Sequence, residues 1–127
     1  MLRFTKNERC VPGHHSNGIL SDGYQLLRAG DRMIDEIHEV KVRKGEVGIF
    51  WLGQNSFVLK TPQNRLPALD MYLSRDKSLR YLHAEPPMRP EDCQFDYVLC
   101  THDHLDHTDP VSLPIIAKSF RTATFFG

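Results

Sequence analysis

The spacing of apolar residues predicts an amphipathic helix in the first third of the chain. Apolar side chains recur every three or four positions between residues 26 and 40, which places them on one helical face. Asp31 is of a residue type that caps helix N-termini, so we expect it to cap the better part of this helix. The apolar positions are Leu26, Leu27, Met33, Ile34, Ile37 and Val40.

Three extended segments are predicted after this helix. The stretch VGIFWLGQNSFVLKTP indicates two strands around Gly53-Gln54-Asn55, because Gly and Asn permit a turn and the aromatic and β-branched flanks favour extended chain. LPALDMYLS predicts the third strand, although Asp70 is unusual in the middle of a core strand. Asp70 is therefore either a strand-end residue or a residue near a site. The proline-rich and charged residues 74–94 predict an irregular connection.

The last third predicts a strand, a polar loop, a helix and a strand. FDYVLCT is typical of a buried strand that delivers a loop at its C-terminal end. Asp109 and Pro110 suit the cap and first position of a helix running to about Ser119. TATFF predicts one more strand. Together with the earlier elements, this order predicts an α/β fold of the layered α+β kind.

Composition narrows the class of protein. The 127 residues, 40% of them hydrophobic, suit one domain or part of one, and the 16 basic and 16 acidic side chains give no general attraction to nucleic acid or to acidic membranes. There is no long apolar run, so we expect a cytoplasmic protein without a membrane partner. The three cysteines are widely spaced, which suits reduced thiols, although Cys100 could lie close to a metal.

Two domain-level regions are expected. Residues 1–23, which contain Pro12 and several glycines, predict a flexible arm, and residues 24–127 predict the folded part. His14 and His15 lie in the arm, where a histidine pair is more often solvated than bound to a metal.

The stretch LCTHDHLDHTD, residues 99–109, holds three histidines and three aspartates. If the chain stays extended there, His102 and His104 project to the same side and can meet one cation. A turn at Leu105 would bring in Asp106 and His107 to hold a second cation. Imidazole and carboxylate suit zinc, manganese or iron, and the positive end of the following helix favours a bound hydroxide or an anionic substrate. The alternative is a polar loop whose histidines only form hydrogen bonds.

The sequence resembles the metallo-β-lactamase superfamily, because THDHLDH matches its HxHxDH signature. WLGQNSFVLK and LDMYLS look like segments of its L-ascorbate-6-phosphate lactonase group, so that the resemblance covers about residues 31–127. It implies the N-terminal half of an αββα sandwich. By motif position, it assigns His102 and His104 to one metal ion, and Asp106 with His107 to the other. Many members also have an aspartate beside the site where Asp70 falls.

The resemblance also implies an activity. Two divalent ions, zinc or manganese, would activate a shared water that opens a small sugar-phosphate lactone, with Asp106 as the catalytic residue that orients this water or relays its proton. Complete members supply further ligands from a second half. The chain is therefore expected to be a fragment that is inactive alone, with one exposed apolar sheet face and either a missing C-terminal half or another copy as its partner. The basic residues in the matching stretch are Lys60, Arg65, Arg75 and Lys77, and none is assigned to the substrate.

Two alternatives stay open. The first is another hydrolase of the same superfamily, including an RNA-processing nuclease, although the chain has no basic patch of the kind that binds RNA. The second is a non-enzymatic metal-binding or assembly module that keeps the motif without turnover.

Overall fold

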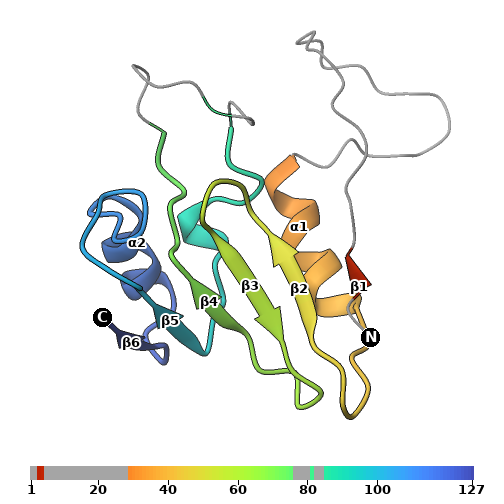
Figure 1. Ribbon diagram of the computed structural model, residues 1–127. Coiled ribbons are helices and arrows are strands. Elements are labelled where there is room, and N and C mark those ends of the chain that lie inside the picture. Colours follow the sequence, from red (N-terminus) through yellow and green to blue (C-terminus); the bar gives the residue numbers. More distant parts are fainter. Residues whose placement is uncertain (1–2, 5–28, 76–80, 82–84) are drawn as a thin grey trace, which may run out of the picture.

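The structure is a computed structural model that describes residues 3–4, 29–75, 81 and 85–127. In this part of the chain, six strands form one sheet and are joined by two α-helices and a short 3-10 helix (Figure 1). The strands are β1 (Arg3–Phe4), β2 (Gly48–Trp51), β3 (Phe57–Lys60), β4 (Pro67–Leu69), β5 (Tyr97–Leu99) and β6 (Thr124–Phe126). The helices are α1 (Ala29–Glu39), η1 (Pro90–Asp92) and α2 (Ser112–Ser119). The predicted α/β layout is confirmed.

The sheet is mixed, and its strands follow one another in chain order from β1 to β6. The β2–β3 and β3–β4 pairs are antiparallel, and the other neighbouring pairs are parallel. The C-terminal ends of β2, β4 and β5 therefore lie at the same end of the sheet. We call it the site end, because the β2–β3 turn, Asp70 and the histidine-rich loop all follow these strand ends.

One face of the sheet is covered by the helices and forms the core. Inward-facing residues of neighbouring strands are paired in register, and Ile37 of α1 and Ile116 of α2 pack with them. Figure 1 shows α1 passing behind β1 and β2. The inward-facing row consists of Phe50, Val58, Ala68 and Val98. All four side chains are buried, as strand alternation requires on a covered face.

The opposite face carries a second apolar row that is partly open to solvent. Trp51, Phe57 and Phe126 are 45%, 37% and 53% exposed. The register runs from Trp51 through Phe57, Leu69 and Leu99 to Phe126. Tyr97 of β5 is also 38% exposed, whereas Val98 is buried. The strand predicted to be buried is therefore buried on one side only, because alternate residues of β5 face this open side.

Lys60 ties β3 to the end of α1. Its side chain is buried, and its Nζ donates to the carbonyl oxygens of Ile37 at 2.8 Å and of His38 at 2.7 Å. Carbonyl oxygens of the last helical turn lack partners within the helix, so a cation suits this place. Burial lowers the pKa of Lys60. Lys60 therefore belongs to the scaffold, at the opposite end of β3 from the β2–β3 turn.

Both helices begin elsewhere than predicted. The helix α1 begins at Ala29, so Asp31 lies inside it and is not its N-cap. The helix α2 begins at Ser112, with Pro110 still in the preceding turn. Pro114 is tolerated in the first turn of α2, where an N–H has no partner within the helix.

Some predictions fall on residues outside the described part. These include His14, His15, Lys77 and nearly all of the predicted arm, of which only Arg3–Phe4 are described, in a parallel pair with β2. Among the described residues, no helix is long and apolar enough to cross a membrane.

Candidate functional site

The histidine-rich loop follows β5 at the site end. The strand ends at Leu99 and residues 101–104 form bends, so the condition of an extended chain, under which His102 and His104 were expected to share a side, is not met. The expected turn at Leu105 is confirmed, because the N–H groups of His107 and Thr108 donate to the His104 carbonyl at 2.9 and 2.7 Å. The Thr108 hydroxyl also donates to the His102 carbonyl at 2.6 Å. This turn folds the second half of the loop back onto the first.

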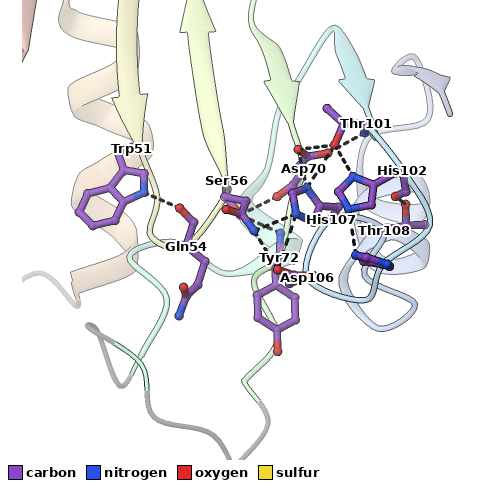
Figure 2. A network of polar contacts seen from close by, with 12 residues as sticks. Trp51, Gln54, Ser56, Asp70, Tyr72, Thr101, His102, Asp106, His107 and Thr108 are labelled. Carbon is purple, nitrogen blue, oxygen red and sulfur yellow. Dashed lines mark hydrogen bonds and ion pairs between the residues drawn. The ribbon is translucent and has the colours of Figure 1, made fainter.

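The loop brings the four candidate ligands together as two pairs. Figure 2 shows His102, Asp106 and His107 close to one another beside Asp70. His102 Nε2 lies 3.1 Å from His104 Nδ1, and both residues are exposed. His107 Nε2 lies 3.6 Å from Asp106 Oδ2. The His107 side chain is 18% exposed and Asp106 is 52% exposed, so His107 is the least accessible of the pair. Its ring also contacts His102, with ring centroids 3.9 Å apart.

Asp70 anchors the start of the loop. It follows β4 directly, its φ is 49°, and it is buried. Its Oδ1 accepts the Thr101 N–H at 2.8 Å, and its Oδ2 accepts the Thr101 hydroxyl at 2.9 Å. The same Oδ2 lies 2.9 Å from His107 Nδ1. Asp70 is thus both a strand-end residue and a residue of the site.

The environment of Asp70 favours its ionised form. Burial alone would raise its pKa, but the hydrogen bonds from the Thr101 N–H, His107 and the Thr101 hydroxyl outweigh burial, and the pKa lies below its ordinary value. A carboxylate only accepts hydrogen bonds, so His107 Nδ1 carries the ring hydrogen and Nε2 presents its lone pair away from Asp70. This is the orientation that a metal-binding histidine needs.

Ser56 fixes the backbone behind Asp70. Its hydroxyl donates to the Asp70 carbonyl at 2.7 Å and accepts the Tyr72 N–H at 2.8 Å. Ser56 is fully buried at the start of β3. The sequence did not identify Ser56, because a single serine beside a turn carries no signal of a contact fourteen residues away.

Asp109 anchors the other end of the loop. Its buried carboxylate accepts the N–H groups of Ser74 at 3.0 Å and Val111 at 2.9 Å, and the Ser112 hydroxyl at 2.5 Å. Burial would raise its pKa, but these hydrogen bonds lower it below the ordinary value. The sequence predicted that the positive N-terminal end of α2 would favour a bound anion. The negative charge near this end is instead the Asp109 carboxylate.

Cys100 lies between β5 and the loop. Its N–H donates to the Phe126 carbonyl at 2.8 Å, which continues the pairing with β6. No hydrogen bond joins its thiol to the candidate ligands in the described part of the chain.

Asn55 reaches the loop from the β2–β3 turn. Its Nδ2 lies 2.9 Å from Asp106 Oδ2 and 3.0 Å from His107 Nε2. The sequence placed Asn55 in this turn as a residue that permits it. The positive φ angles belong instead to Gly53 at 94° and Gln54 at 51°.

The donor atoms suit a divalent metal ion, since imidazole nitrogen and carboxylate oxygen bind zinc and manganese. Among the described residues, however, no group of three or more His, Cys, Asp or Glu side chains is arranged to hold an ion. The loop offers two pairs of ligands instead. Catalytic zinc sites usually have three protein ligands, so the chemistry of each pair fits an ion but its number of ligands is small.

No protein-family model matches the chain. A UPF0173 metal-dependent hydrolase from Anaeromyxobacter dehalogenans strain 2CP-1 is 34% identical over 74 residues, which are 58% of this chain and 25% of that protein. A protein of the same name from Polynucleobacter asymbioticus is 30% identical over 86 residues, which are 65% of this chain and 27% of that protein. The chain is similar to metal-dependent hydrolases. It matches about a quarter of their length.

Proposed function

We propose that this chain forms part of a metal-dependent hydrolase with the metallo-β-lactamase fold. Residues 24–127 would provide one half of the αββα sandwich. The names of the similar proteins support the hydrolase class. The open apolar row from Trp51 to Phe126 supports the fold, because a second sheet would cover such a face.

The contact between Asp70 and His107 carries this proposal. A metal-binding histidine commonly donates its other ring N–H to a carboxylate, which fixes the ring and raises its basicity. The 2.9 Å contact gives His107 this arrangement. We assign His102 and His104 to one ion, and Asp106 with His107 to a second.

The ions, zinc or manganese, would activate a shared water and polarise the substrate carbonyl. The protein groups then have separate roles. Asp106 orients the water or accepts its proton, since its side chain is accessible and lies beside His107. Asp70 holds His107, and Asp109 closes the loop at its far end.

We further propose that the substrate is a sugar-phosphate lactone such as L-ascorbate 6-phosphate. The segments WLGQNSFVLK and LDMYLS, which resemble the lactonase group, support this choice. They also supply Asn55 and Asp70 at the site end. Lys60 and Arg65 face the opposite end of the sheet, so neither is available to a phosphate group at the loop.

Metal analysis tests the assignment. In the complete protein, alanine at His102 or His104 should remove one ion, and alanine at Asp106 or His107 mainly the other, as measured by equilibrium dialysis against zinc and elemental analysis. Asp103→Ala, in the same loop, is the matched control and should keep both ions. Full metal content in all four variants would contradict the assignment.

Lactone hydrolysis tests the reaction. In the complete protein, turnover should require added zinc or manganese and should fall about 10²- to 10⁴-fold in Asp106→Ala, which is the usual contribution of a general base. Because the loop offers two ligands per ion, we expect the 127-residue chain alone to bind metal weakly and to turn over near background. Ion-dependent cleavage of RNA in place of the lactone would favour the nuclease alternative.

A further inference from the structure

The side-chain amide of Asn55 contacts two candidate ligands that lie far from it in the sequence. Asn55 is in the β2–β3 turn, whereas Asp106 and His107 lie in the loop after β5, 51 and 52 positions later. The distances from Asn55 Nδ2 are 2.9 Å to Asp106 Oδ2 and 3.0 Å to His107 Nε2. This contact joins two separate segments of the site end.

The hydrogen-bond roles of these atoms agree with one another. His107 Nδ1 donates to Asp70, so His107 Nε2 is an acceptor, and the Asp106 carboxylate accepts as well. The Asn55 amide nitrogen carries two hydrogens, one for each acceptor. The amide therefore stands where the lone pairs of Asp106 and His107 converge.

The backbone does not explain why this residue is asparagine. Gly53 and Gln54 have the positive φ angles of the turn, and Asn55 is not among the positive-φ residues. Side-chain chemistry is the remaining difference between Asn55 and other turn residues. The two contacts use the amide nitrogen, the donor group of this side chain.

Asp106 depends on Asn55 more than His107 does. His107 is also held through its Nδ1 by Asp70 at 2.9 Å and by Thr101 at 3.1 Å. Asp106 is 52% exposed, and Asn55 is its only side-chain hydrogen-bond partner in the part of the chain that the structure describes. Without Asn55, the Asp106 carboxylate would sample more rotamers, and ordering it would cost free energy on binding.

We propose that Asn55 is a positioning residue whose amide aligns Asp106 with His107 before a metal ion binds. This inference rests on the proposed function. His107 Nε2 has one lone pair, so it must release Asn55 in order to bind an ion. Asp106 has a second oxygen with which it can keep the amide.

Zinc titration of the full chain by calorimetry tests the proposal, with Asn55→Ala compared with Gln54→Ala. Gln54 is the neighbouring residue in the same turn, and only its backbone carbonyl forms a described hydrogen bond. We expect Asn55→Ala to weaken zinc binding about 10-fold. This is the lower end of the roughly 10- to 100-fold range that follows loss of a group orienting a metal ligand. Gln54→Ala should bind as the wild type does. Equal affinity in both variants would overturn the proposal.

Nitrogen NMR of the wild-type protein gives a second readout that needs no variant. On addition of zinc, the side-chain amide signals of Asn55 should shift together with His107 Nε2, while those of Gln54 stay in place. A His107 shift without an Asn55 shift would overturn the proposal. Failure of the proposed function looks different, because the wild type and His107→Ala would then bind zinc equally.

Discussion

Two aspartates stand at opposite ends of the β4–β5 pair. Asp70 follows β4 and holds Thr101, which follows β5, whereas Asp96 precedes β5 and holds Leu66, which precedes β4. The Leu66 N–H donates to Asp96 Oδ2 at 2.8 Å, just as the Thr101 N–H donates to Asp70 Oδ1 at 2.8 Å. Both carboxylates therefore close one end of the same parallel pair.

The remaining partners of the two carboxylates differ. Asp96 pairs with Arg65 at 2.6 Å, on the surface, where an ion pair adds little to stability. Asp70 instead contacts His107. A hydrogen bond to a backbone N–H is thus enough to account for an aspartate at the end of a strand. Only the second partner of Asp70, a histidine, points to a role in a functional site.

The largest expected difference between variants of Asp70 and Asp96 is in the free energy of unfolding. Asp70→Asn should lower the free energy of unfolding by about 2 kcal/mol, because buried donors lose their charged acceptor. Asparagine tolerates the positive φ of Asp70, so the loss reports the carboxylate. Asp96→Asn should cost about 1 kcal/mol, since the Asp96 side chain is 25% exposed against 8% for Asp70. Urea unfolding measures both, and a larger loss in Asp96→Asn would contradict the comparison.

The next difference is in metal affinity, and it rests on the proposed function. Asp70→Asn should weaken zinc binding about 10-fold, because the amide no longer fixes the hydrogen on His107 Nδ1. In Asp96→Asn the affinity should be unchanged, since Asp96 lies at the other end of the sheet. Calorimetric titration of both purified variants decides the matter. Equal weakening would mean that the two aspartates act only through the sheet.

The smallest effect concerns acid stability at Asp96. Burial would raise its pKa, but hydrogen bonds from the Leu66 N–H and Arg65 lower it below the ordinary value. The stabilisation is therefore complete above the unfolded pKa of about 3.9 and is lost as the pH falls through the lower folded pKa. Urea midpoints measured between about pH 5 and pH 2.5 should fall less steeply in Asp96→Asn than in the wild type. Parallel curves would contradict this assignment.

Most elements of the fold could be predicted because their signals are local. The Gly53-Gln54-Asn55 turn and the flanking residues that favour extended chain located β2 and β3, the apolar run FDYVLCT located β5, and TATFF located β6. The first residues of the helices were harder to predict from the sequence. Asp31 and Asp109 both have a capping side chain, but α1 begins before Asp31, and Asp109 lies three residues ahead of α2 with its carboxylate shared with Ser74.

The candidate site was predictable only in part. The spacing of the loop residues indicated two ligand pairs, and the structure brings each pair together. The contacts of Asn55 and Ser56 could not be inferred, because they cross between strands and depend on sheet register. The sequence marked Asn55 for its backbone, although the structure uses its side chain.

The position of Trp51 makes the β2–β3 turn observable by tryptophan fluorescence. It is the only tryptophan in the chain, and its Nε1 donates at 2.8 Å to the carbonyl of Gln54, next to Asn55. Indole emission depends on the solvent and on the hydrogen bonding of this N–H, and Trp51 is 45% exposed. All tryptophan fluorescence of the protein therefore originates beside the candidate site, where a movement of the turn can be followed in solution without a label.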